Sequence, residues 1–271
     1  MRTLSLLLAT SLLTSIVPIA SAQETPVPRI APSGFHEVAH EEGVTIWKNR
    51  RNEYMQIVSP HRGAVVDLLH GGILPTEGAG TNFARRDLRD WWTEWKAKTP
   101  DALTIANGQF FNMNDPAKSP LAFSTKIDGI VHVGYGDEAE YGGKKMLLRI
   151  GKRYATVEPY SDNAGSLYEF TEPDIIVGLR PDVSKSGNRR LGRTFMGTMR
   201  NGNLLIFSSP AASQRYSERI MMAFGADRNR IMMLDGGGST QLIQEGKLLI
   251  PSSKNPELRR VPLAIGVTAG D

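Results

Sequence analysis

Short β-type runs, each ended by glycine, asparagine or proline, recur along most of this sequence and limit what it can fold into more than any other feature. Pairs of runs meet at the dipeptides Asp128-Gly129, Asn201-Gly202 and Glu245-Gly246, which suit the positive φ angles of tight hairpin turns. Hairpins therefore outnumber strand–helix–strand crossovers. The pattern predicts a single α+β domain with a mixed, largely antiparallel sheet and a few packed helices.

Residues 83–100 have helical rather than β-type spacing. Trp91, Trp92 and Trp95 fall on one face, charged residues occupy the other, and Pro100 ends the pattern. Three tryptophans can stack on sugar rings, but an amphipathic helix more commonly uses such a face as core. We therefore expect a helix packed through its tryptophans.

A second helix is predicted within residues 209–225. Ser209 and Pro210 have the pattern of an N-cap and a first-turn proline, and Gly225 suits the position after the last turn.

The N-terminal residues have the pattern of an export signal. Residues 1–22 combine one basic residue, an apolar stretch and small residues before the expected cleavage point. Residues 23–34 are rich in proline and polar residues, which predicts an extended leader before a domain spanning 35–271. The chain has no cysteine, so it offers neither disulfides nor a lipid-modified anchor. We expect a periplasmic or secreted bacterial protein without a membrane span after cleavage.

The charge balance narrows the class of partner. A formal net charge of +4 mildly favours anionic ligands, but the basic residues are spread along the chain rather than clustered. This distribution argues against a nucleic-acid-binding protein.

The stretch "HEVAH" matches the zincin pattern through His36, Glu37 and His40. That pattern requires a helix to bring both imidazoles to one face, and Gly34 and Gly43 leave room for barely two turns. A zinc peptidase is therefore a minor alternative.

The stretch "IMMLDGGGSTQLI" interrupts an apolar run with Asp235, three glycines and two hydroxyl residues. Successive glycines allow main-chain N–H groups to converge on an anion or a sugar oxygen, and Asp235 would place a carboxylate beside them. The residue directly before Ser239 is not a lysine, which argues against a nucleotide-binding P-loop. A turn that merely joins two strands needs fewer glycines, so a functional loop is favoured.

Two further segments carry candidate site residues. Asn107 ends a predicted strand and precedes Phe110 and Phe111, which suit either a pocket wall or the core. Arg193 stands at the start of another strand, where a guanidinium needs an anion, a carboxylate or other acceptors. Phosphate binding and a structural ion pair are equally compatible with that position.

In this order, "NGQFF", "RTFMG", "MMLDGGGSTQL" and "RRVPLAIGV" resemble the phosphodiester glycosidase family. The resemblance covers roughly Leu103 to Val267, and Asp-Gly-Gly-Gly-Ser is its most specific element. It implies an exported glycoside hydrolase that cleaves a sugar-1-phosphodiester at the anomeric carbon in a phosphate-linked glycan. It implies catalytic roles for Asp235 and Arg193, and substrate contacts for Asn107, Phe110, Phe111, Thr194, Gly236, Gly237, Gly238 and Ser239.

Two departures from the family pattern concern the entrance to this site. Gln109 replaces the usual glycine before the paired phenylalanines, and Ala122 stands in the later Pro-x-Gly motif. Substrate identity is therefore not carried over, and a non-catalytic phosphoglycan-binding protein is the main alternative.

The reaction that the resemblance implies is compatible with a single catalytic carboxylate. A phosphate ester leaves as a stable anion, so it needs less help from a general acid. If a second acid takes part, Asp128, Asp162 and Asp182 are unranked candidates. No cofactor is indicated, and a divalent cation is left open.

Overall fold

The computed structural model describes residue 32 and residues 34–76, 80–136, 141–160, 166–252 and 259–270. The expected signal peptide at 1–22 lies outside these ranges, as does the expected leader at 23–34 except for Pro32 and Gly34. Within the described ranges, no helix has the length and apolar character that a membrane span requires.

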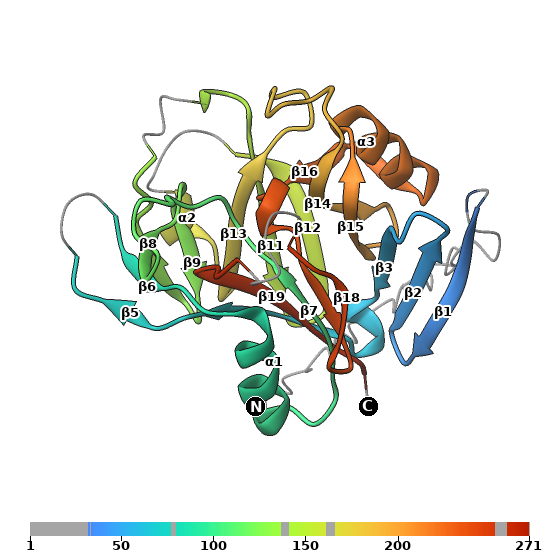
Figure 1. Ribbon diagram of the computed structural model, residues 1–271, viewed down its shortest axis with the longest axis horizontal. Coiled ribbons are helices and arrows are strands. Elements are labelled where there is room, and N and C mark those ends of the chain that lie inside the picture. Colours follow the sequence, from blue (N-terminus) through green and yellow to red (C-terminus); the bar gives the residue numbers. More distant parts are fainter. Residues whose placement is uncertain are drawn as a thin grey trace, which may run out of the picture.

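Sheet A is the larger of the two main sheets and has eleven strands (Figure 1). Its main path runs in the order β1 (Phe35–Glu41), β2 (Val44–Asn49), β3 (Tyr54–Val58), β15 (Leu204–Ala212), β14 (Leu191–Met199), β16 (Ala226–Met233), β13 (Asp174–Leu179), β11 (Lys145–Gly151) and β12 (Tyr154–Pro159). The hairpin of β9 (Thr125–Ile127) and β10 (Ile130–His132) joins this sheet through β13.

Sheet B crosses in front of sheet A in Figure 1 and has five strands. Their order is β18 (Lys247–Ile250), β17 (Leu242–Gln244), β7 (Ala102–Asn107), β19 (Leu263–Thr268) and β4 (Val65–His70). A small third sheet contains β5 (Ile73–Leu74), β6 (Asn82–Ala84) and β8 (Lys118–Pro120).

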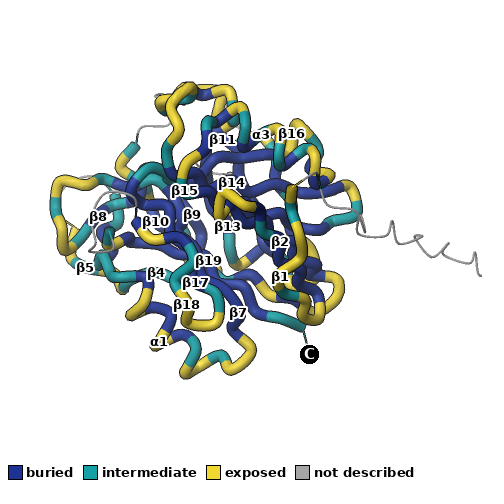
Figure 2. The backbone as a smooth tube through the Cα atoms, turned by 45° about the vertical axis from the view of Figure 1, so that its right-hand side comes forward, coloured by how far each residue is buried: buried dark blue, intermediate teal, exposed yellow. Residues whose placement is uncertain are grey.

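Helices cover the outer sides of the two main sheets. Helix α1 (Leu88–Lys98) contacts β7 and β17 of sheet B, and α3 (Gln214–Ala223) contacts β14, β15 and β16 of sheet A. The described part also contains the short helix α2 (Ser166–Glu169) and the 3-10 turns Pro60–Arg62 and Gly237–Ser239. The strands of both sheets are buried along most of their length, whereas exposed residues gather in loops and on β1 (Figure 2).

Alternation along the strands of sheet A divides the core in two. Met196 and Ile206 face the cluster shared with sheet B, while their neighbours Phe195 and Phe207 face the cluster that includes Phe224 after α3. Each fully buried side chain of this size contributes about 1.5–3 kcal/mol to folding. A buried hydrogen bond of 2.5 Å from Thr104 Oγ1 in β7 to Gln56 Oε1 in β3 further ties the sheets together.

The expectation of a mixed sheet was too broad, because every strand pairing in the described residues is antiparallel. The sheet-dominated, antiparallel fold with a few helices is otherwise as predicted.

Helix α1 begins later than the sequence pattern suggested. Phe83 belongs to β6, and Asp87 caps the helix by accepting a hydrogen bond from Arg89 N. The three tryptophans are buried in the core cluster, as expected for an amphipathic helix rather than a sugar-stacking surface.

The start of α3 was also misplaced. Ser209 and Pro210 continue β15, and Ser213 is the N-cap, accepting from Tyr216 N. Strand pairing outweighs the local helix-start signal here, because Ser209 is paired with Arg193 in β14.

The zincin interpretation of His36, Glu37 and His40 is wrong. These residues lie on the edge strand β1, where four residues span about 13 Å, and cannot present two imidazoles as successive helical turns would. Among the described residues, no group of three His, Cys, Asp or Glu side chains is arranged to hold a metal ion.

At the edge of sheet B, the carboxylate of Asp67 lies near those of Asp174 and Asp128 on the side of sheet A. Asp67 of β4 is partly buried, and this burial, with the charges of Asp174 and Asp128, raises its pKa to about 6 from 3.8. The folded state therefore binds a proton more tightly than the unfolded chain does. The contribution of this group to the free energy of unfolding is therefore greatest below about pH 4 and declines as pH rises toward 6.

We expect Asp67→Asn to raise the free energy of unfolding at pH 7 by about 1–2 kcal/mol relative to wild type, because the amide removes the buried charge. The gain should shrink at pH 4, where the wild-type carboxyl is mostly protonated. Thermal unfolding at both pH values measures it, with Asp101→Asn at an exposed turn as the control for removing a charge. An equal gain at both pH values would contradict this account.

Candidate functional site

The glycine loop crosses from one sheet to the other. After β16 ends, Leu234 N still donates to Thr194 O of β14 at 2.9 Å, and Asp235 N donates to Gly108 O just beyond β7 at 3.3 Å. The chain then turns through the 3-10 segment Gly237–Ser239 and enters sheet B as β17. Asp235 therefore stands at the junction of the two sheets: the residue before it bonds to sheet A, and its own main chain bonds beyond the end of β7 in sheet B.

Asn107 fastens this junction. Its Oδ1 accepts from Thr194 Oγ1 at 2.7 Å and from Gln241 N at 3.2 Å, and its Nδ2 donates to Asp235 O at 2.8 Å. Asn107 and Thr194 are both buried. Their polar groups are thus committed to the protein, so positioning of Asp235 fits this geometry and direct substrate binding does not.

Glycine stands at each of the three loop positions for a different structural reason. A Cβ at Gly236 would lie 2.7 Å from Gly192 O, and Gly237 adopts a φ of 61°. A Cβ at Gly238 would lie 2.8 Å from Nη2 of Arg259, whose guanidinium packs against this glycine. The three glycines therefore allow a close chain approach, a left-handed turn and a neighbouring cation.

Two of the loop amides bond within the loop itself. Gly236 N donates to Oδ1 of Asp235 at 2.8 Å, and Ser239 N donates to Gly236 O at 3.1 Å. These two N–H groups hold the loop's own shape, so the expected convergence of glycine amides on a ligand does not extend to them.

The carboxyl of Asp235 has an unusual electrostatic environment. Burial raises its pKa to about 6, and the Ser239 hydroxyl, the Gly236 amide and the charges of Arg259 and Lys185 oppose this rise. The residue nevertheless keeps partial exposure to solvent. Such a carboxyl is ionised at neutral pH but close to its midpoint, which suits a base or a nucleophile.

The guanidinium of Arg259 lies beside the glycine loop. Its main-chain carbonyl accepts from Gln241 Nε2 at 2.8 Å, and its Nη1 lies 2.9 Å from Met113 Sδ. Arg85 supports the same segment by donating to the carbonyl of Arg260 through Nε and Nη2 at 3.2 and 3.1 Å. Burial lowers the pKa of Arg85, as does repulsion from Arg259, while Asp235 is among the charges that raise it.

Lys185 approaches from the loop between β13 and β14. Its Nζ bonds the Tyr141 hydroxyl and lies 4.6 Å from the centre of the Tyr141 ring and 5.9 Å from that of Phe110. Cation–π contacts of this kind hold an ammonium group in place while leaving its charge available.

Arg193 does not occupy the expected place of a phosphate ligand. Its guanidinium is buried and donates to four main-chain carbonyls, those of Ala212, Lys185, Ser186 and Arg189, at 3.1, 3.0, 2.9 and 3.3 Å. A strand arginine does need acceptors, but here the acceptors are carbonyls rather than an anion. The expectation that Arg193 stabilises a leaving group is therefore corrected to a role in holding the 185–189 loop.

The paired phenylalanines separate to opposite sides. Phe111 is buried in the cluster shared with sheet B, whereas Phe110 packs against the outer cluster and beside Lys185. Phe110 therefore lies beside Lys185, whereas the ring centre of Phe111 lies 5.0 Å from the guanidinium carbon of Arg85.

The two departures from the family pattern lie together. Gln109 Oε1 accepts from Phe123 N at 2.8 Å, and Ala122 N donates to Phe110 O at 2.7 Å. Gln109 therefore fastens the segment that contains Ala122 against the strand that leads to Phe110.

The candidate second acids receive no support. Asp128 lies beside Asp174, at the end of β13 opposite to Leu179, the residue that pairs with Met233 near Asp235. Asp182 is exposed and paired with Arg180 at 3.3 Å. Asp162 lies outside the described residues.

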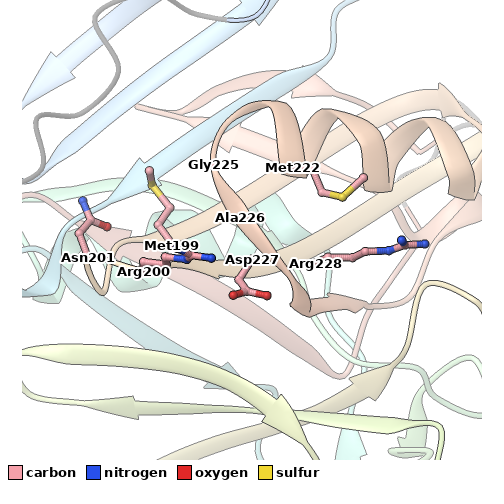
Figure 3. Close-up of a pocket in the computed structure, with 8 residues that line it drawn as sticks. All are labelled: Met199, Arg200, Asn201, Met222, Gly225, Ala226, Asp227 and Arg228. Atoms are coloured by element: carbon pink, nitrogen blue, oxygen red, sulfur yellow. The ribbon is translucent and has the colours of Figure 1, made fainter.

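Two cavities lie elsewhere on the described surface. One of about 490 Å³ surrounds the start of β16 at Ala226 (Figure 3). The start of this strand lies roughly 20 Å from Met233 at its other end. The other, of about 380 Å³, includes Arg180, Asp182 and Glu218. Neither is lined by Asp235, Lys185 or Arg259.

The family model "Phosphodiester glycosidase" matches residues 87–268, most of the chain. The chain belongs to the phosphodiester glycosidase family. The match includes Asp235, Arg259, Lys185 and the Asn107 junction, but not Arg85. No curated protein matches the chain by sequence.

Solved structures with TM-scores above 0.5 share the fold at low sequence identity. The catalytic domain of zebrafish N-acetylglucosamine-1-phosphodiester alpha-N-acetylglucosaminidase, auto-inhibited by its pro-peptide, is 16% identical with a TM-score of 0.53, over 88% of this chain and 82% of that one. A putative exported protein from Burkholderia pseudomallei is 13% identical with a TM-score of 0.51, over 83% and 74%. A hypothetical protein from Synechocystis is 16% identical with a TM-score of 0.49, and 87% of this chain covers 61% of its length.

Lys185 and Arg259 lie beside the candidate site and were not among the residues that the sequence indicated. Arg259 belongs to the "RRVPLAIGV" stretch that carried the family resemblance, and its distance in sequence from Asp235 hid the contact with Gly238. Lys185 lies in a polar loop without periodicity, and no local pattern distinguishes it from other exposed lysines.

Gly236→Ala and Gly238→Ala form a matched pair that separates chain packing from electrostatics. We expect Gly236→Ala to destabilise the protein by about 1–3 kcal/mol, because its Cβ meets a main-chain carbonyl that cannot move freely. Gly238→Ala should cost less, because the obstructing atoms belong to the end of a flexible arginine. Chemical denaturation measures both.

Gly238→Ala should also change the electrostatic environment of Asp235. Displacing Arg259 removes a positive charge that lowers the pKa of Asp235, so the pKa should rise above about 6 in Gly238→Ala. An NMR titration of the Asp235 carboxyl carbon reports it. An unchanged pKa would mean that Arg259 does not act on this carboxylate.

Proposed function

We propose that this protein is an exported hydrolase that cleaves a sugar-1-phosphodiester bond at the anomeric carbon, acting on phosphate-linked glycans in the periplasm or outside the cell. The observation that carries the proposal is the carboxylate of Asp235, with a pKa raised to about 6, beside the cations Arg259 and Lys185 at the sheet junction. Family membership and the activity printed for the zebrafish enzyme support the same reaction class.

The pairing of one carboxylate with cations suits a phosphate leaving group. In the reaction, the bond between C1 and the phosphate oxygen breaks, its electron pair stays on phosphate, and water supplies a hydroxyl to C1 and a proton. The diester carries one negative charge, whereas the departing monoester acquires a second one. Arg259 and Lys185 therefore stabilise the charge that develops as the bond breaks.

Asp235 supplies the carboxylate in either of two ways. As a nucleophile it forms a glycosyl ester that water then hydrolyses, and as a general base it takes the proton from the attacking water. The first course retains the anomeric configuration and the second inverts it. NMR of the first-formed sugar anomer distinguishes them.

The sugar and the group beyond the phosphate are set by residues that this chain does not share with the family pattern. Gln109 fixes the segment around Ala122 beside Phe110, so the entrance differs from one built on glycines. N-acetylglucosamine, named for the zebrafish enzyme, is one sugar to test rather than the assigned substrate.

The decisive experiment follows release of reducing sugar from a panel of sugar-1-phosphodiesters. We expect turnover by the wild-type protein and a loss of at least about 1,000-fold in kcat for Asp235→Asn, which retains the size of the side chain but neither base nor nucleophile. Binding should survive in this variant. Tight binding by the wild type without any turnover would instead indicate a phosphoglycan-binding protein.

The dependence of kcat/KM on pH provides a second prediction. Because Asp235 must be ionised, activity should rise with pH up to about 6 and then level off. Arg259→Gln removes a charge that favours ionisation, so the rising limb should move to higher pH. A limb that stays in place would show that Arg259 does not act on the group that titrates.

A further inference from the structure

We propose that Arg193 and Gln214 are positioning residues that fix Lys185 at the candidate site. The inference that Lys185 meets the substrate rests on the proposed function. The inference that its position depends on these two side chains rests on the geometry alone.

Lys185 is held by its main chain on both sides. Its N–H donates to Gln214 Oε1 at 2.9 Å, and its carbonyl accepts from Arg193 Nη1 at 3.0 Å. Arg193 and Gln214 are each only 3% exposed, and both hydrogen bonds are partly buried. Partly buried bonds to a guanidinium are stronger than fully exposed ones.

The same two side chains also fix the segments before and after Lys185. Gln214 Nε2 donates to Val183 O at 2.7 Å and to Pro181 O at 3.3 Å. Arg193 Nη2 donates to the carbonyls of Ser186 and Arg189, at 2.9 and 3.3 Å. The whole turn around Lys185 is therefore attached to β14 and to the first residue of α3.

The fixed main chain directs the Lys185 ammonium toward the sheet junction. Its Nζ bonds Tyr141 and lies on the Phe110 ring, and Phe110 follows two residues after Gly108, whose carbonyl binds Asp235 N. A free lysine side chain samples many rotamers, whereas this one begins from a clamped main chain and ends between two rings. Pre-organisation of this kind is what an electrostatic site requires.

This arrangement also explains why an arginine stands at position 193. One planar guanidinium reaches four carbonyls from different directions, which a single ammonium cannot do. Arg193→Lys would keep the charge but lose most of these bonds.

The first test measures the position of Lys185 without any substrate. Trace labelling with acetic anhydride, read by mass spectrometry, compares Lys185 with the exposed Lys152 in the same sample. We expect Lys185 to react several-fold faster in Gln214→Ala and in Arg193→Lys than in wild type, with Lys152 unchanged. Arg215→Ala, on the exposed neighbour of Gln214, is the matched control.

The second test is a double-mutant cycle on inorganic phosphate binding, measured by calorimetry. We expect Lys185→Gln and Gln214→Ala each to weaken binding about tenfold, and the double variant to bind no more weakly than Lys185→Gln alone. The proposal would be overturned if the weakening factors of the two single variants multiplied in the double variant, or if the labelling of Lys185 were unchanged. If wild type binds no phosphate, the proposed contact of Lys185 with the phosphate group fails, while the labelling result still decides whether Arg193 and Gln214 position Lys185.

Discussion

The side-chain amide of Asn107 is the interaction on which the site depends. It joins Thr194 of sheet A, Gln241 at the entry to sheet B and the main chain of Asp235 between them. Antiparallel sheets satisfy their own main chains, but a segment that passes from one sheet to another leaves those ladders and needs other partners. Asn107 supplies both a donor and an acceptor at that point, so the carboxylate of Asp235 is placed by the fold rather than by a flexible loop.

Polar side chains around this junction mostly bind main chain, and the cations they support act on Asp235. Gln241 and Arg85 hold the carbonyls of Arg259 and Arg260, and Arg193 and Gln214 hold the main chain around Lys185. The two cations beside Asp235 thus come from segments that are distant in sequence and are held in similar ways. A site built on fixed main chain costs little reorganisation when charge develops.

The sequence predicted the features that depend on short-range physics. The tryptophan face of α1 and the Glu245-Gly246 hairpin turn, where both residues have positive φ, followed from spacing and turn chemistry. At Asn201-Gly202 only Gly202 has positive φ, so that hairpin does not use the turn type with positive φ at both residues that its dipeptide suggested. The start of α3 was misjudged because pairing of Ser209 with Arg193 is a long-range contact that local signals do not carry.

The candidate site shows the same division between local and long-range information. The sequence indicated Asp235 and its glycines as candidates because an aspartate followed by glycines interrupts an apolar strand, which local sequence makes visible. The role of Arg193 was misjudged because its acceptors are carbonyls of a loop with no sequence signature. Lys185 and Arg259 were missed because only the folded chain brings them to Asp235. Residue type is local information, whereas the direction of a buried charge is set by tertiary contacts.

Charge balance connects these placements to the chemistry. Asp235 and a bound phosphodiester together bring two negative charges, and Arg259 and Lys185 bring two positive ones, with Arg85 within range of Asp235 as a third. If Asp235 attacks C1, its own charge disappears as the ester forms, while the phosphate gains one. The total charge of the site then stays constant and only shifts from the carboxylate toward the phosphate. Cations that lie around both groups can follow this shift without moving, and a second acid is not needed to neutralise the leaving oxygen.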